Sequence, residues 1–111
     1  MNQIFGLIIF KLINGDLEGR WMNNQVPIWQ PENAQRRAGD ITSFVGRYNS
    51  NWIDASGAFN ATLVINRDNN SPRFDLNWAP VRDVKNAVVD ANFIGIGAII
   101  DEELVCTYLM V

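Results

Sequence analysis

Amphipathic aromatic side chains are the residues of this sequence best suited to holding a ligand. Tryptophan and tyrosine each combine an apolar ring, which can form the wall of a pocket, with an N–H or O–H group that can hydrogen-bond a ligand. The six side chains of this kind are Trp21, Trp29, Tyr48, Trp52, Trp78 and Tyr108, and the candidate polar partners are Asn23, Ser50 and Asn77. Any single one of these rings is more often a core side chain than a ligand contact, so the elements that position them decide between the two roles.

Residues for metal binding and for nucleophilic catalysis are scarce. The chain has no histidine and a single cysteine, Cys106, which excludes histidine-dependent triads, multi-cysteine metal sites and an intramolecular disulfide. Cys106 alternates with Leu104 and Tyr108, and because no histidine is present to activate its thiol, it is interpreted as a small buried apolar side chain. We therefore predict no metal and no cofactor.

Carboxylates cluster once, at Asp101, Glu102 and Glu103. These residues separate two apolar segments, where a hairpin turn is expected and where solvation keeps carboxyl groups near their ordinary pKa. We interpret them as a charged turn that keeps the hairpin soluble. Catalysis would require an aspartate or glutamate of raised pKa inside the fold. The sequence singles out none, so a protein without enzymatic activity is predicted.

Charge and the N-terminal segment restrict the partners. Nine Lys and Arg against twelve Asp and Glu give a net charge of −3 and no basic stripe for nucleic acid. The opening segment, residues 1–15, lacks the positive region and the cleavage site of a secretory signal, and it is too short to span a bilayer. We expect neither a nucleic-acid nor a membrane partner, and a cytoplasmic location is the default expectation.

Apolar and polar residues alternate with a period of two along several segments, which predicts an all-β chain. The clearest strands are "GAFNATLVIN" (residues 57–66) and "RFDLNWA" (residues 73–79), which are joined by the turn-like "RDNNSP". One face of the first strand carries Phe59, Ala61, Leu63 and Ile65, and one face of the second carries Phe74, Leu76 and Trp78. The two strands are predicted to form a hairpin.

The remaining segments extend this hairpin into a meander. Asn14-Gly15 is the strongest hairpin signal of the chain. The expected order is a strand over 3–13, a strand over 17–29, a polar loop over 30–39, a strand over 41–48 and, after the central hairpin, a last hairpin from 92–100 to 104–111. Residues 80–91 are expected to form one or two helical turns or a packed loop. The prediction is one domain, residues 1–111, in which seven to eight antiparallel strands form a closed or nearly closed meander barrel whose first and last strands pair.

Three of these segments are apolar on both faces, namely residues 3–13, 93–100 and 104–111. A closed barrel makes them neighbours, and their outer faces then form one apolar patch larger than monomers usually expose. A second copy of the chain is the expected cover. This predicts a homo-oligomer, a dimer or tetramer, in which each subunit buries about 800 Å² or more. The alternative is that residues 81–91 fold back over the patch.

Two short motifs resemble the avidin and streptavidin family. "GRWMNNQ" is similar to the Gly-x-Trp-x-Asn opening strand of that family, and "VGRYNS" to its Gly-x-Tyr-x-Ser element. The matching positions are Gly19, Trp21 and Asn23 in the first motif and Gly46, Tyr48 and Ser50 in the second. Trp78 falls about where the family has a pocket-wall tryptophan, and "FIGIG" followed by Tyr108 resembles its Trp-x-Gly strand and the aromatic residue of the next strand.

The resemblance covers roughly residues 17–108 and implies a small-molecule site. In that family Asn, Tyr and Ser hydrogen-bond the ureido oxygen of biotin and tryptophans enclose its apolar part. The chain departs from the family at residues 88–91, which replace a hydroxyl-bearing stretch, and the family's C-terminal strand with its ligand-binding Asp has no counterpart. A lipocalin-like relationship implies the same barrel.

These observations predict a non-catalytic binding protein, a homo-oligomeric barrel that holds a small, partly apolar ligand at its mouth. The predicted site residues are Trp21, Asn23, Trp29, Tyr48, Ser50, Trp78 and Tyr108. One alternative is a protein- or glycan-interaction module with a packed barrel core, acting through the outer patch or an exposed loop at Trp52. The other is a carboxylate-dependent, lipocalin-like enzyme.

Overall fold

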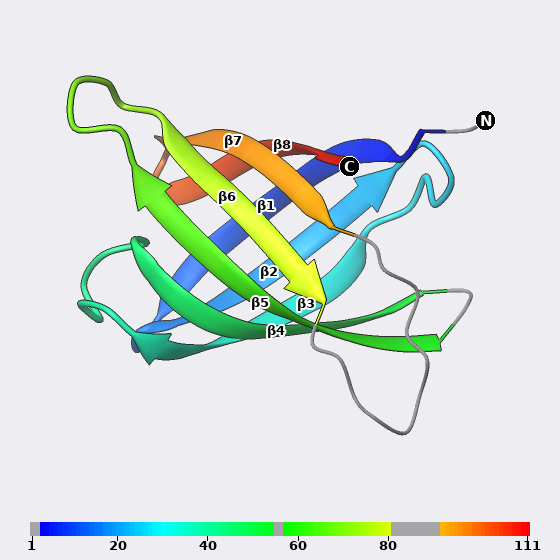
Figure 1. Cartoon of the computed structure of the whole chain (residues 1–111), viewed down its shortest axis with the longest axis horizontal. Coiled ribbons are helices and arrows are strands. Elements are labelled where there is room, and N and C mark those ends of the chain that lie inside the picture. The colour runs from blue at the N-terminus through cyan, green and yellow to red at the C-terminus, as the bar shows by residue number, and fades with distance from the viewer. Residues whose placement is uncertain (1–2, 55–56, 81–91) are drawn as a thin grey trace.

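Eight antiparallel strands in chain order form a closed barrel in the computed structural model of the chain (Figure 1). The strands are β1 (Phe5–Ile13), β2 (Asp16–Asn23), β3 (Gln30–Ala38), β4 (Gly46–Asp54), β5 (Gly57–Arg67), β6 (Phe74–Pro80), β7 (Phe93–Ile100) and β8 (Glu103–Met110). The structure describes residues 3–54, 57–80 and 92–111. Each strand pairs with the next, and β8 pairs back with β1. The predicted all-β meander barrel is confirmed.

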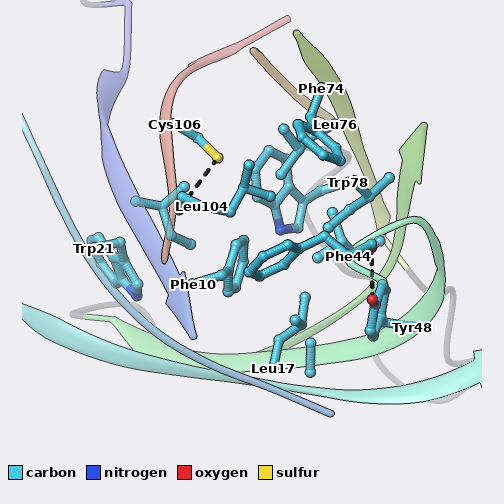
Figure 2. Packing of buried hydrophobic residues seen from close by; sticks show 14 of the residues in the cluster. Phe10, Leu17, Trp21, Phe44, Tyr48, Phe74, Leu76, Trp78, Leu104 and Cys106 are labelled. Atoms are coloured by element: carbon cyan, nitrogen blue, oxygen red, sulfur yellow. Dashed lines mark hydrogen bonds between the residues drawn. The ribbon is translucent and has the colours of Figure 1, made fainter. Parts of the chain in front are cut away.

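Alternation along the strands builds the core. Successive side chains of a strand point to opposite faces of the sheet, so every second residue enters the barrel. Leu63 and Ile65 of β5 are fully buried, and they lie opposite Trp78 and Leu76 of β6, which are buried as well. The predicted central hairpin is confirmed with its inward face. Figure 2 shows how these buried side chains converge from several strands on one interior.

Strand β3 occupies the segment that was expected to be a polar loop. Its inward side chains, Glu32 and Ala34, are buried, while their neighbours along the strand are exposed. The loop prediction for residues 30–39 was wrong because the buried face of this strand carries a small side chain and a carboxylate. Apolar alternation, the usual signature of a half-buried strand, is therefore absent.

Strand β2 ends at Asn23, earlier than the predicted limit at Trp29. The side-chain oxygen of Asn23 accepts hydrogen bonds from the backbone N–H groups of Gln25 (2.8 Å) and Val26 (2.7 Å). An asparagine that bonds the backbone two and three residues ahead directs the chain into a turn. This turn ends the strand and leads the chain into β3.

The end of the barrel near the β3–β4 loop is filled. Residues 41–44, which were predicted to begin a strand, form turns instead, and Phe44 enters the core from this loop. The hydroxyl of Tyr48 donates to the backbone oxygen of Phe44 over 2.7 Å (Figure 2). The guanidinium of Arg36 donates to that hydroxyl (2.7 Å) and to the backbone oxygens of Gly15 (2.6 Å) and Val45 (3.0 Å). The loop is thereby tied to the barrel wall.

Both predicted tight hairpin turns are present. Asn14 and Gly15 have φ values of 51° and 88°, and Asp101 and Glu102 have φ values of 50° and 70°. Two consecutive residues of positive φ give the turn whose twist fits a two-residue hairpin, and Asn-Gly adopts it readily. The acidic segment is therefore a hairpin turn, as expected from its composition.

Residues 81–91, which make up nearly all of the segment expected to form helical turns or a packed loop, lie outside the described residues. The alternative in which this segment covers the outer patch lies outside them too. Across residues 3–54, 57–80 and 92–111, no helix is both long and apolar enough to cross a membrane.

Because of the core, the same substitution at two isoleucines should lower the free energy of unfolding by very different amounts. Ile65 is fully buried and Ile53 is 69% exposed. Ile65→Ala leaves a cavity and should lower the free energy of unfolding by about 2–5 kcal/mol, whereas Ile53→Ala should change it by about 0.5 kcal/mol or less. Denaturation in urea measures both values. Equal losses in the two variants would contradict the placement of Ile65, and Ile65→Val, with a loss of about 1 kcal/mol, serves if the alanine variant does not fold.

Candidate functional site

A cavity of about 140 Å³ lies inside the barrel at the end where β2 passes into β3. Five aromatic side chains line it, namely Trp21, Trp52, Trp78, Phe93 and Tyr108. The other lining residues are Ile4, Ile8, Asn23, Gln25, Val26 and Glu32. The cavity is thus mostly apolar, with a few polar groups, which is the usual composition of a small-molecule site.

Glu32 is the charged side chain among the described residues that line this cavity. Its carboxyl oxygen Oε2 accepts a hydrogen bond from the Ser50 hydroxyl (2.7 Å) and another from the indole N–H of Trp78 (2.9 Å). These donors come from β4 and β6, so the carboxyl group is held by strands on two sides of the barrel. The side chain of Glu32 is only 5% exposed.

Burial changes the acidity of Glu32. Removal of the carboxylate from water raises the pKa of Glu32 from 4.5 to about 7, although the hydrogen bonds from Ser50 and Trp78 act in the opposite direction. Desolvation outweighs two donors because a buried charge loses its whole hydration shell. The group therefore exchanges a proton near neutral pH.

The neighbours of Glu32 on β8 are uncharged at neutral pH. Burial raises the pKa of Cys106 to about 12, and the nearby Glu32 carboxyl adds to the effect. Burial raises the pKa of Tyr108 to about 12 as well. Cys106 is 1% exposed, so it is a buried, protonated thiol, as the sequence indicated. Neither group supplies a charge that would balance the carboxylate.

The aromatic walls form a connected series. Trp78 packs against Tyr108 with ring centroids 6.0 Å apart, Tyr108 against Phe93 at 5.8 Å, and Phe93 against Trp52 at 6.2 Å. Glycines make room for two of these rings. A Cβ atom at Gly6 would lie 2.8 Å from the Tyr108 ring, and one at Gly95 would lie 3.2 Å from the Trp78 ring. The rings of Tyr108 and Trp78 therefore pack so closely against these glycines that a side chain there would displace them.

Trp21 contributes a buried donor. Its ring lines the cavity and is 4% exposed, and its Nε1 atom has no hydrogen-bond partner among the described residues. A buried N–H group without a partner costs free energy, which an acceptor on a bound molecule would recover. The cavity is thus lined by the ring of Trp21, whose buried Nε1 atom has no partner among the described residues, and by the carboxyl group of Glu32.

The structure brings together four of the seven predicted site residues. Trp21, Asn23, Trp78 and Tyr108 line the cavity. Asn23 lies there with its side-chain oxygen already engaged in the turn after β2. Ser50 lies behind the cavity wall and acts through Glu32, to which it donates.

The other two predicted site residues lie elsewhere. Tyr48 is fully buried at the filled end, where it bonds Arg36 and Phe44. Trp29 is 45% exposed outside the cavity, with the Arg20 guanidinium 5.6 Å from its ring centroid. The candidate partner Asn77 lies on an exposed strand position.

Two residues of the cavity were not among the seven predicted site residues. Trp52 was one of the six candidate aromatic side chains, and the interaction-module alternative placed it in an exposed loop. It belongs to β4 and lines the cavity, and its ring stacks on that of Phe59 at 5.7 Å. Glu32 was missed because its segment was interpreted as a loop. The available signal was weak: Glu32 and Ala34 are two residues apart, as on one face of a strand, but an inward glutamate does not resemble a core position.

A second surface of interest covers the outside of β1, β8 and β7, which lie side by side (Figure 1). Leu109 of β8 pairs with Phe5 and Ile94 of its two neighbours, and Thr107 pairs with Leu7 and Ile96. These apolar side chains are exposed, Phe5 at 59% and Ile96 at 54%, and they border a groove of about 640 Å³. We call this surface the β1–β8–β7 face.

Comparisons of the chain with family models, with curated proteins and with solved structures found no match. The closed eight-stranded antiparallel barrel is compatible with a calycin-like fold.

The raised pKa of Glu32 predicts a stability that falls as the pH rises. The folded protein holds the proton more tightly than the unfolded chain, so unfolding is favoured progressively between pH 4.5 and about 7. The loss should total about 3 kcal/mol over that interval, given about 1.4 kcal/mol per unit of pKa. Urea denaturation at several pH values measures it in the wild type and in Glu32→Gln, which should lack this component.

Glu18→Gln is the matched control, because Glu18 is exposed on the outer face of β2. This variant should keep the pH dependence of the wild type. Parallel pH profiles for the wild type and Glu32→Gln would show that Glu32 does not titrate as described.

Proposed function

We propose that the protein is a non-catalytic binding protein that holds a small, partly apolar ligand in the barrel cavity. The observation that carries this proposal is a cavity of about 140 Å³ that combines five aromatic rings with one buried carboxyl group. A barrel whose only role was structural would gain stability by filling this space with apolar side chains. Burial of the Glu32 carboxyl group beside this space lowers the stability of the fold, and a role in ligand binding would explain why the group is there.

Each part of the cavity has a role in this proposal. Trp52, Trp78 and Phe93 enclose the apolar part of the ligand. The N–H group of Trp21 binds an acceptor, and the Glu32 carboxyl binds a donor, with Ser50 and Trp78 holding it in place. Because these groups come from several strands of one closed barrel, they are preorganised for binding.

A more specific version of this proposal relates the chain to the avidin or lipocalin families. The closed meander barrel and the cavity positions of Trp21, Asn23 and Trp78 are in favour. The hydroxyl groups of Tyr48 and Ser50 bond other protein groups, so the polar contacts of the ligand here would differ from those of a biotin site.

The alternative of an interaction module requires a packed core. The cavity counts against that requirement, although the β1–β8–β7 face would suit such a module.

The second candidate function is catalysis by Glu32. A buried carboxyl group whose pKa lies near 7 has the acidity that a general acid or base needs at neutral pH. In such a reaction Glu32 would accept a proton from the bound molecule and return it at another atom. The fate of the bound molecule separates the two candidates, because a binding protein releases it unchanged.

We propose further that the barrel acts as a homo-oligomer through the β1–β8–β7 face. The face is apolar over three adjacent strands and continues onto Met22 of β2. Polar side chains lie beside it at Arg20 on β2 and at Asp75 and Asn77 on β6. An apolar centre with a polar rim is typical of an interface between subunits. A second copy brings the same apolar surface, so one two-fold contact covers both faces.

Tryptophan fluorescence tests ligand binding. Titration with a panel of small metabolites, short lipids and sugars should quench the emission saturably for at least one member, because Trp21, Trp52 and Trp78 line the cavity. Trp21→Phe, which removes the N–H group, should bind that member about fivefold more weakly, since one hydrogen bond contributes about 1 kcal/mol.

Trp29→Phe is the matched control and should bind like the wild type, because Trp29 lies outside the cavity. A flat response across the whole panel would contradict the proposal. Chromatography of the recovered ligand distinguishes binding from catalysis.

Sedimentation equilibrium tests the assembly. At micromolar concentration the wild type should have at least twice the 12.5 kDa mass of one chain. Ile96→Glu places a charge within the β1–β8–β7 face, beside β8, and should sediment as a monomer, since an unpaired buried charge is costly. Ile53→Glu, at an exposed position of β4, should keep the wild-type mass. A wild type that sediments as a monomer would refute this part of the proposal.

A further inference from the structure

The Glu32 carboxyl group has no charged partner among the described residues. It is the single charged side chain among the eleven described residues that line the cavity. The three ion pairs found in the described part of the chain, which involve Arg20 and Arg73, do not include it. Both of its hydrogen bonds end on Oε2, and none of the described residues donates to Oε1. Within the described part of the chain, Oε1 of this carboxyl group therefore remains available to a donor on a bound molecule.

The groups that face Glu32 from the other strands do not supply a positive charge to its carboxylate. Ser50 on β4 and Trp78 on β6 are neutral donors. Cys106 and Tyr108 on β8 are the titratable groups that sense its charge, and both stay protonated at neutral pH. A buried carboxylate without a cation costs several kcal/mol. A positively charged ligand would offset that cost, whereas an anion would increase it.

The walls of the cavity suit the same kind of ligand. Aromatic rings carry negative charge on their faces and attract ammonium groups, tryptophan most strongly. Three tryptophans, one tyrosine and one phenylalanine line this cavity. Its volume of about 140 Å³ is close to that of an apolar cavity, roughly 150 Å³, that accommodates benzene. The ligand therefore has an apolar part no larger than about one aromatic ring.

We propose that the cavity binds a small organic amine in its protonated form, with the ammonium group on Glu32 Oε1 and an apolar body against the aromatic walls. This inference rests on the proposed ligand-binding function and specifies its ligand class. The N–H groups of the protonated amine donate hydrogen bonds to the carboxylate. Trp78 and Ser50 hold the carboxylate in the orientation that these hydrogen bonds need. No bond is made or broken beyond the loss of a proton from Glu32 when the acid form is present.

The proposal requires a defined pH dependence. The ammonium group pairs with ionised Glu32, so binding below the pKa of Glu32, about 7, must first remove its proton. Affinity for an amine should fall about tenfold for each pH unit below 7 and level off above it. A neutral analogue should show no such fall.

Calorimetric titration with three probes of one shape tests the proposal. The probes are benzylamine, benzyl alcohol and toluene, each of which carries a single aromatic ring. At pH 8 benzylamine should bind the wild type at least tenfold more tightly than either neutral probe. Near pH 7 its binding should also release a fraction of a proton, which appears as a difference in heat between two buffers of unlike ionisation enthalpy.

Two variants isolate the role of Glu32. Glu32→Gln keeps the shape and an acceptor oxygen but removes the charge, so it should abolish the preference for benzylamine and the proton release. Glu18→Gln removes one charge from the outer face of β2 and should keep both. If Glu32→Gln does not fold, the pH dependence and proton release of the wild type still decide the matter.

The possible results separate this inference from the function on which it rests. Binding of benzyl alcohol or toluene as tightly as benzylamine would overturn the amine proposal and leave the binding function standing. Amine binding that is unchanged between pH 8 and pH 5 would overturn the role of Glu32. Failure of all three probes to bind would count against the amine proposal, and with a flat fluorescence response to the wider panel it would remove the binding function as well.

Discussion

The pairing of β1 with β8 is the constraint on which the rest of the structure depends. It turns an eight-stranded meander into a barrel with no free edge, and so removes the unpaired backbone groups that an open sheet exposes. Closure also sets the two surfaces of the molecule. Inside, it places side chains of β3, β6 and β8 around one cavity, and outside, it makes the three strands that are apolar on both faces into neighbours.

Glu32 shows how such an enclosure changes the chemistry of an ordinary side chain. On an exposed strand this carboxyl group would be solvated and ionised. Within the barrel, burial raises its pKa to about 7 despite two donors, because desolvation is the larger effect. The protein therefore carries a destabilising group in a cavity lined by aromatic rings, and a site for a donor-bearing ligand gives that arrangement a reason.

The two ends of the barrel differ in how their buried polar groups are hydrogen-bonded. At one end Arg36 donates to backbone oxygens and to the hydroxyl of Tyr48, so its charge is balanced by hydrogen bonds to the protein itself. At the other end the carboxyl group of Glu32 is held on one oxygen, and space remains beside it. Among the described residues, polar groups with all their partners therefore mark the structural end, whereas Glu32 Oε1 and Trp21 Nε1, which have none there, mark the candidate site.

The sequence by itself determined the strands that have an apolar face, the Asn14-Gly15 hairpin and the outward apolar residues of β1, β7 and β8, because alternation and turn chemistry are local. Only the tertiary structure identified β3, since its inward residues are Glu32 and Ala34 and their burial depends on strands far away in the chain. Antiparallel closure in chain order requires an even number of strands, which makes this strand necessary once β1 and β8 pair. The cavity and the pKa of Glu32 were likewise decided by tertiary structure, because desolvation arises from residues that converge only when the barrel closes.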